Sequence, residues 1–386
     1  MKLTKSEEEL MNILWKHKKA FMKDLLDAYP EPKPATTTVA TLLKGAGYAT
    51  GAFGKWGLGS PGSEGDPTQQ GFDRFYGYNC QRNAHTFYPT WLFDDKKKIE
   101  LDGKTYSHDL IVEEALEFIR TNKDRPLFCY MPVTIPHAAM HVPEEYVKPF
   151  RKPFEKYENV IGRYRPPLVK NPVAAFAGMM TKLDEDVGKV LDLLKALEID
   201  EKTLVIFTSD NGPHKEGGHR PEVFDSNGPL RGLKRSVTEG GIRVPMLAWW
   251  PGTVEAGAQS DHISAFWDVL PTFCDMAGIK TPEDLDGISY LPALTGKGEQ
   301  KKHDYLYWAF YEQGGKRAIR MGPWKMVQLH LKKKPNSPME LYNLDEDIGE
   351  EKNVAEAHPE ILKRMKEIIA EAESPSSIPA WQFSKN

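Results

Sequence analysis

The chain has 386 residues, of which 40% are hydrophobic and 27% charged, as in an ordinary soluble globular protein. Its net charge of −4 argues against a protein built around nucleic acid, and its three cysteines, Cys80, Cys129 and Cys274, lie too far apart for a disulfide framework or zinc knuckle. The sequence contains no stretch of about 18 apolar residues and no apolar core of a secretory signal, so as written it predicts a cytoplasmic protein without a membrane partner.

Residues 1–44 carry the pattern of three short helices. Thr4 and Glu7 fit a capping box ahead of an apolar stripe, and prolines at positions 30, 32 and 34 end the second helix. Threonines at positions 36–38 are suitable N-caps for a third helix, which glycines at 45 and 47 terminate. This segment is therefore predicted to be a helix-turn-helix-like unit.

From Tyr48 onward, strand and helix patterns alternate. This alternation predicts a mainly parallel sheet with helices on both faces, in an α/β domain that spans residues 45–304. A second domain, residues 305–386, is predicted to hold antiparallel strands and a final helix. The α/β strands are expected at residues 48–53, 126–133, 203–212 and 244–252, and its helices at 106–122, 174–197 and 268–279. The C-terminal strands are expected within 305–311, 317–329 and 339–347, and the last helix at 358–373.

Residues that suit ion binding follow several of these strands. Asp210 and Asn211 end the strand at 203–212, and their oxygen atoms suit Ca²⁺ or Mg²⁺, although Asp-Asn-Gly also makes a simple turn. Lys55 and Lys234 lie in glycine-rich turns, where an ammonium group can hold sulfate or phosphate. The alternative for each lysine is a solvated surface position.

Two histidines follow the strand at 126–133. A histidine at the carboxyl end of a strand can bind an anion or protonate a leaving oxygen. His137 and His141 both meet this description, and their spacing does not rank them.

Five segments occur in the order found in type I sulfatases: GYATGAFGKWGLG, PHAAMHVPEE, FTSDNGPHKEGG, SNGPLRGLKRSVTEGGIRVPMLAWWPG and MELYNLDED. The chain resembles this arylsulfatase-like family over about residues 41–383, and the ordered set is far more specific than any single motif. The resemblance implies an alkaline-phosphatase-like α/β fold with a small C-terminal sheet domain. It also implies hydrolysis of sulfate esters, on a sulfated small molecule or carbohydrate, with Ca²⁺ as cofactor.

The resemblance also assigns roles to residues that match the motifs by position. It implies catalytic roles for Lys55, His137 and Lys234, metal binding by Asp210 and Asn211, and substrate contacts by His85 and His214.

Two pieces that the family needs are not found in the printed sequence. One is a first strand that ends in two aspartates, and the other is a C-x-P-S-R or S-x-P-S-R segment whose Cys or Ser becomes the formylglycine nucleophile. Because that strand is central to the family's sheet, we expect unpaired apolar strand edges and poor solubility. With two oxygen donors, Ca²⁺ affinity is expected to be roughly millimolar, and turnover unmeasurable.

The segment LTKSEEELMNILWKHKKAFMKDLLDAYPEPKPATTTVATLLK, residues 3–44, resembles penicillinase-repressor-type winged-helix regulators. This second resemblance implies that the helix at 36–44 faces DNA. Residues 1–44 hold eight Lys or Arg against six Asp or Glu, which gives little electrostatic affinity for DNA. We interpret the chain as a fusion, joined within residues 36–44, in which a regulator's N-terminus replaces the start of a sulfatase.

Three functions therefore compete. The first is a sulfatase-family hydrolase with impaired or no activity, and the second is a noncatalytic pseudoenzyme on the same scaffold. The third, a DNA-binding regulator with a sulfatase-like domain, ranks last, so no nucleic-acid partner is expected. Members of the sulfatase family that the chain resembles are usually periplasmic or secreted. The sequence as written instead predicts a cytoplasmic location.

Overall fold

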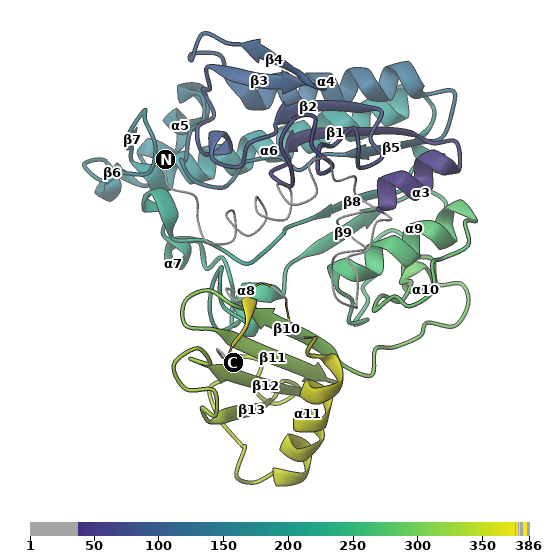
Figure 1. The fold of residues 1–386 in the computed structure, drawn as a ribbon. Coiled ribbons are helices and arrows are strands. Elements are labelled where there is room, and N and C mark those ends of the chain that lie inside the picture. The colour runs from purple at the N-terminus through teal and green to yellow at the C-terminus, as the bar shows by residue number, and fades with distance from the viewer. Residues whose placement is uncertain (1–37, 375, 377, 379–380, 384–386) are drawn as a thin grey trace, which may run out of the picture.

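The computed structural model describes residues 38–374, 376, 378 and 381–383, arranged as an α/β part and a separate four-stranded sheet (Figure 1). The first two predicted helices, within residues 1–34, lie outside this range. The third is present as α3 (Val39–Gly45), and the Thr38 hydroxyl caps it by accepting a hydrogen bond from the Thr41 amide at 3.2 Å. Within the described ranges, no helix is both long and apolar enough to cross a membrane.

The central sheet has five strands in the order β4-β3-β2-β1-β5. Strand β1 (Ala49–Lys55) pairs in parallel with β2 (Arg74–Tyr78) and with β5 (Leu127–Tyr130). Strands β3 (Trp91–Asp94) and β4 (Lys97–Glu100) form an antiparallel hairpin at the edge. The sheet is therefore mixed rather than mainly parallel, because a charged hairpin that the sequence analysis did not identify extends it.

The remaining two α/β strands stand apart from this sheet. Strand β8 (Val205–Thr208) pairs only with β9 (Met246–Trp249) among the described residues, and the two strands are antiparallel. Both strands were predicted, but as members of one sheet with β1 and β5. The described sheet is thus divided between β5 and β8 (Figure 1).

Helices cover both faces of β1, as predicted. Helix α4 (Ser107–Asn122) packs Ile111, Ala115 and Phe118 against Phe53 on one face. Helix α3 packs Ala40 against Ala52 on the other. Because both faces are covered, the first six residues of β1 are buried.

The remaining helices and short strands of the α/β part complete this core. They are the helices α5 (Glu144–Arg151), α6 (Pro172–Ala196), α7 (Pro221–Phe224), α8 (Glu239–Ile242), α9 (Val269–Ala277) and α10 (Leu291–Thr295), the short strands β6 (Ile161–Gly162) and β7 (Val169–Lys170), and the 3₁₀ turns η1 (Asn83–His85), η2 (Glu155–Tyr157), η3 (Asp200–Lys202), η4 (Glu216–Gly218) and η5 (Phe266–Asp268).

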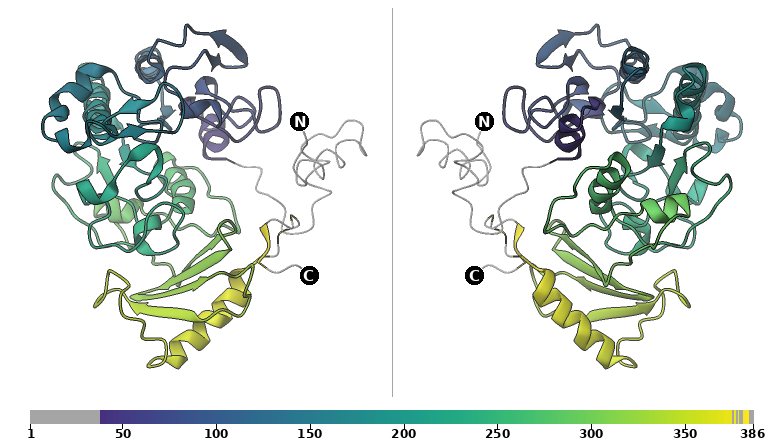
Figure 2. Two further views of the ribbon diagram at one scale, coloured as in Figure 1. Left: turned by 90° about the vertical axis from the view of Figure 1, so that its left-hand side faces the viewer. Right: turned by 90° about the vertical axis from the view of Figure 1, so that its right-hand side faces the viewer.

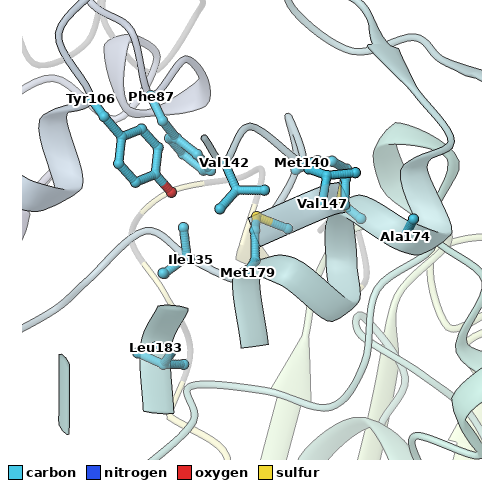
Figure 3. Packing of buried hydrophobic residues seen from close by; sticks show 11 residues of the cluster. Phe87, Tyr106, Ile135, Met140, Val142, Val147, Ala174, Met179 and Leu183 are labelled. Atoms are coloured by element: carbon cyan, nitrogen blue, oxygen red, sulfur yellow. The ribbon is translucent and has the colours of Figure 1, made fainter. Parts of the chain in front are cut away.

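A buried apolar cluster fixes the loop that follows β5. Ile135, Met140 and Val142 from this loop lie beside Met179 of α6 and Phe87 (Figure 3). Met140 and Met179 are completely buried. The cluster therefore holds both ends of the segment that contains His137.

The C-terminal sheet is antiparallel in the order β10-β11-β12-β13. Helix α11 (Pro359–Ala372) packs Met365 and Ile368 against one face, which is turned away from the α/β part (Figure 2). The opposite face packs on Val237 of the α/β part. The strands are β10 (Leu306–Phe310), β11 (Lys316–Met321), β12 (Trp324–Leu329) and β13 (Met339–Asn343).

Candidate functional site

The structure brings the site residues predicted from the sequence to one cavity. Lys55 ends β1, His137 follows β5 and Asp210 follows β8, so the carboxyl ends of three strands meet there, as in other α/β sites. The cavity has a volume of about 4800 Å³ and continues between β5 and β8. Its lining includes Lys55, His85, His137, Asp210, Asn211, His214 and Lys234.

Close backbone packing fixes the position of Lys55. Its amide donates a hydrogen bond to the Pro132 carbonyl at 2.8 Å, just beyond β5. The preceding residue, Gly54, has φ +142°, and a Cβ there would lie 2.2 Å from the same carbonyl oxygen. Glycine therefore allows β1 to approach the β5 loop closely enough to direct Lys55 into the cavity.

The turn that holds Asp210 and the loop that holds Lys234 are also joined through the backbone. The Lys234 amide donates to the Pro213 carbonyl at 2.8 Å. Gly212 donates to the Gly241 carbonyl at 3.0 Å, and a Cβ at Gly212 would lie 1.9 Å from the Gly240 oxygen. These contacts set the Lys234 loop against the end of β8.

The same loop is anchored on the C-terminal sheet. The Arg231 guanidinium donates to the Tyr342 hydroxyl at 2.8 Å and to the Glu350 carbonyl at 3.1 Å. The Glu239 carboxylate lies 2.7 Å from the ammonium group of Lys325, which is completely buried in β12. The position of Lys234 therefore depends on both parts of the molecule.

Three histidine rings form a row along the cavity. The ring centroids of His85 and His137 are 5.6 Å apart, and those of His137 and His214 are 5.2 Å apart. His137 Nδ1 lies 2.6 Å from the Ala138 carbonyl, so Nδ1 carries the proton and Nε2 is left to accept one. His214 accepts a hydrogen bond from the Glu216 amide at Nδ1 and donates to the Pro136 carbonyl from Nε2.

Burial lowers the pKa values of these side chains, and for Lys234 and His137 neighbouring cationic groups lower them further. Burial lowers the pKa of Lys55, against the opposing attraction of Asp210, and burial likewise lowers the pKa of Lys234. Burial, together with Lys234, His214 and Lys55, lowers the pKa of His137 to about 4. Neither Lys55 nor Lys234 forms an ion pair with a residue that the structure describes. Cationic groups that disfavour one another's charge in this way are stabilised by a bound anion.

The structure distinguishes the two histidines that the sequence analysis left unranked. His137 lies in the cavity, whereas His141 is 2% exposed and has structural partners. His141 Nδ1 accepts a hydrogen bond from the Phe87 amide at 3.3 Å, and Nε2 donates to the Pro167 carbonyl at 2.7 Å. His141 therefore secures the loop, and His137 is the histidine available to a ligand.

Other residues at the rim were not predicted from the sequence. The exposed ring of Tyr164 lies 5.4 Å from His85, edge to face. Arg235, next to Lys234, pairs with Glu216, which also contacts His214. The adjacency of Arg235 to Lys234 was a visible signal, but Tyr164 comes from a loop with no motif of its own.

The described residues do not by themselves make up a calcium site. Asp210 and Asn211 offer two side-chain oxygen donors, whereas Ca²⁺ takes six to eight. In the ranges that the structure covers, no group of three or more His, Cys, Asp or Glu side chains could hold a metal ion.

Two family models match the chain. The model named Sulfatase matches residues 4–279, and the model named N-sulphoglucosamine sulphohydrolase, C-terminal, matches residues 233–374. The Sulfatase match begins at residue 4, whereas the motifs that resemble the family begin at about residue 41. The resemblance of residues 3–44 to winged-helix regulators stays a prediction.

Curated relatives are also sulfatases. N-acetylgalactosamine-6-sulfatase of Rattus norvegicus is 33% identical over 276 residues, which is 66% of this chain and 47% of the relative. Arylsulfatase A of Homo sapiens is 30% identical over 86% of this chain and 70% of its own length. The chain spans about half the length of the N-acetylgalactosamine-6-sulfatases that it matches.

A similar solved structure is the one titled Ps i-CgsB in complex with k-i-k-neocarrahexaose. It aligns with a TM-score of 0.72 and 28% identity, over 88% of this chain and 75% of that one. Fold, ordered motifs and family match agree, since the Sulfatase model covers more than half of the residues and includes the lysines and histidines named above that line the cavity. The chain belongs to the sulfatase family.

Proposed function

We propose that the cavity binds the sulfate group of a sulfated carbohydrate between Lys55 and Lys234. The observation that carries this proposal is the convergence of two half-buried lysines and three histidines, all with lowered pKa values, at the ends of three strands. An anionic ligand offsets the mutual repulsion of these groups, and charge-assisted hydrogen bonds from lysine suit sulfate oxygens.

A carbohydrate is favoured over a simple aryl ester by the rim. Tyr164 exposes an aromatic face on which a sugar ring can pack, and the Arg235 guanidinium beside it can donate to hydroxyl or acidic groups. The names of the relatives support the same class, because N-acetylgalactosamine-6-sulfatase and the neocarrahexaose complex both concern sugars.

His137 is placed to respond to the bound ester. With a pKa of about 4 it is neutral at pH 7 in the empty cavity. A sulfate between the lysines raises the pKa of His137, because the anion favours the imidazolium form. Nε2 then takes up a proton that it can pass to the leaving oxygen.

The family takes its nucleophile from a C-x-P-S-R or S-x-P-S-R motif, and the printed sequence contains neither. We propose that the chain as printed binds sulfate esters and hydrolyses them slowly or not at all, as a noncatalytic member would. Asp210 and Asn211 would hold Ca²⁺ only weakly, because they offer two side-chain oxygen donors and this metal takes six to eight.

Calorimetric titration with a sulfated carrageenan oligosaccharide tests the binding. We expect Lys55→Ala and Lys234→Ala each to weaken binding by about tenfold to a hundredfold, as for loss of a charged hydrogen bond. Lys297→Ala, an exposed lysine outside the cavity lining, is the matched control and should bind as the parent does. Equal affinity for the desulfated oligosaccharide would contradict a sulfate site.

A second assay addresses turnover. We expect no steady release of 4-nitrophenol from 4-nitrophenyl sulfate, with or without added Ca²⁺. Steady release that disappears in both lysine variants would show that another group replaces the formylglycine nucleophile.

A further inference from the structure

A short hairpin brings an aromatic and two basic side chains to the rim of the cavity. Strands β6 and β7 pair with each other, and the loop between them, residues 163–168, has the sequence RYRPPL. The side chains of Arg163, Tyr164 and Arg165 are all exposed. We call residues 163–168 the rim loop.

Backbone contacts hold the rim loop in place. The buried His141 ring donates from Nε2 to the Pro167 carbonyl at 2.7 Å, and the Thr86 hydroxyl donates to the Pro166 carbonyl at 3.4 Å. At the base of the hairpin, a Cβ on Gly162 would lie 2.3 Å from a backbone oxygen of turn η4, so the hairpin packs directly on that turn. A ligand that binds to a loop fixed in this way loses little affinity to loop ordering.

Tyr164 places the rim loop next to the row of histidines. Its ring centroid lies 5.4 Å from that of His85 and 6.1 Å from that of His137, edge to face in both cases. Burial lowers the pKa of His85, and nearby cations, including Arg165, lower it further. Tyr164 lines the cavity, whereas Arg165 does not. The Arg165 guanidinium therefore lies close to the histidine row but outside the space between the two lysines.

The charges around these rings do not balance. Four cations and two carboxylates have the largest electrostatic effects on the pKa values of the two cavity lysines, His85 and Tyr164, namely Lys55, Lys234, Arg165, Arg235, Asp210 and Glu216. With both lysines protonated, their net charge is +2, and one sulfate ester between the lysines offsets only one of these charges. Glu216 pairs with Arg235, whereas Arg165 forms no ion pair with any residue that the structure describes.

We propose that Arg165 binds a second sulfate group of the ligand, on the sugar next to the one whose sulfate lies between Lys55 and Lys234. This inference rests on the proposed function, and it narrows the substrate class to oligosaccharides with sulfate groups on adjacent sugars. A planar guanidinium can form two parallel hydrogen bonds with the oxygens of such a group. The Tyr164 ring lies where it can pack against the sugar that connects the two sulfates.

Calorimetric titration with two neocarrabiose ligands tests the proposal. One ligand carries a single sulfate, and the other carries one sulfate on each sugar. The parent chain should bind the disulfated ligand about tenfold more tightly, as expected for one additional charged hydrogen bond. Arg165→Gln should remove this preference and leave the affinity for the monosulfated ligand unchanged. Arg165→Lys, which keeps the charge without the planar fork, should retain part of the preference.

Arg163→Gln is the matched control, because it removes the same charge from an exposed position of the same loop. Arg163 is not among the cations that act on His85 or Tyr164, so this variant should bind both ligands as the parent does. An equal loss of preference in the two glutamine variants would assign the effect to long-range attraction and overturn the subsite. Equal affinity of the parent for the two ligands would also overturn it.

Lys55→Ala separates a failure of this inference from a failure of the proposed function. The variant should weaken binding of both ligands by a similar factor. If both ligands bind the parent equally and both depend on Lys55, the cavity site stands and the subsite at Arg165 is rejected. If the monosulfated ligand binds no more tightly than unsulfated neocarrabiose, the proposed function is rejected and this inference with it.

Discussion

His137 shows how its surroundings set the charge of a single side chain. Its ring is half-buried, stacks between two other histidines and lies near two lysines. Its pKa of about 4 is below the ordinary value of 6.5, so in the window between these values the unfolded chain binds a proton that the folded chain does not. The stability contributed by neutral His137 is therefore complete above pH 6.5 and is lost as the pH falls toward 4.

Ligand binding should have the opposite dependence on pH. Because a bound sulfate raises the pKa of His137, we expect affinity to increase as the pH falls from 8 to 5, with proton uptake on binding. His85 and His214, whose pKa values are also lowered, contribute in the same direction. Calorimetric titration in buffers of different ionisation enthalpy measures both quantities.

The control is His137→Gln, which keeps a polar side chain without the titration. It should flatten part of the pH dependence and reduce proton uptake. Unchanged proton uptake in this variant would mean that His137 does not respond to the ligand.

At the scale of elements, a buried charged cluster joins α4 to α6. Asp186 accepts hydrogen bonds from His108 Nε2 at 2.9 Å and from Lys189 at 2.7 Å, and it also contacts Lys182. Burial alone would raise the pKa of Asp186, but these hydrogen bonds hold it well below the ordinary value. Asp186 is 3% exposed, so its charge is compensated almost entirely by these partners.

Asp186→Asn should therefore lower the free energy of unfolding by about 3–5 kcal/mol, as for loss of one partner from a buried pair. Asp184→Asn, an exposed change on the same helix, should alter it by less than about 0.5 kcal/mol. Urea denaturation of both variants measures the difference. Similar stabilities would mean that the cluster contributes little beyond packing.

Arg231 connects the loop that holds Lys234 to the C-terminal sheet, through hydrogen bonds to Tyr342 of β13 and to the Glu350 carbonyl. Arg231→Met should loosen that loop and weaken binding of the sulfated oligosaccharide by about twofold to thirtyfold, equivalent to 0.5–2 kcal/mol of coupling. Calorimetric titration with the oligosaccharide measures the change.

Arg364→Met, an exposed change on α11 away from the loop, is the control. If Arg231→Met bound as tightly as this variant, the sheet would have no part in placing Lys234.

At the scale of the whole molecule, the long amphipathic helices were the most predictable features. Helices α4 and α6 lie within two residues of the predicted ranges, because apolar periodicity over many turns is a strong signal. The β3–β4 hairpin was missed because its turn lies in the charged run DDKKK, which has no glycine, and Asp95 takes the left-handed conformation instead. The predicted domain limits stay predictions.

The site was predictable for a similar reason, and only in part. Residues at the carboxyl ends of parallel strands must meet, so Lys55, His137 and Asp210 could be grouped from the chain alone. The choice between His137 and His141 required the tertiary contacts that bury His141. Tyr164 could not be found, because a rim residue on a loop leaves no periodic trace in the sequence.

The anchoring of the Lys234 loop on the C-terminal sheet has a thermodynamic consequence. Lys55 is positioned by the central sheet, whereas the loop that holds Lys234 is positioned by contacts with β12 and β13. Affinity for an anion should therefore exist only in molecules in which the α/β part and the C-terminal sheet have both folded and packed together. By mass action, a ligand at a hundred times its dissociation constant adds about 2.7 kcal/mol to that docked state. A sulfated sugar would then act as a folding ligand that protects molecules with both parts docked against unfolding.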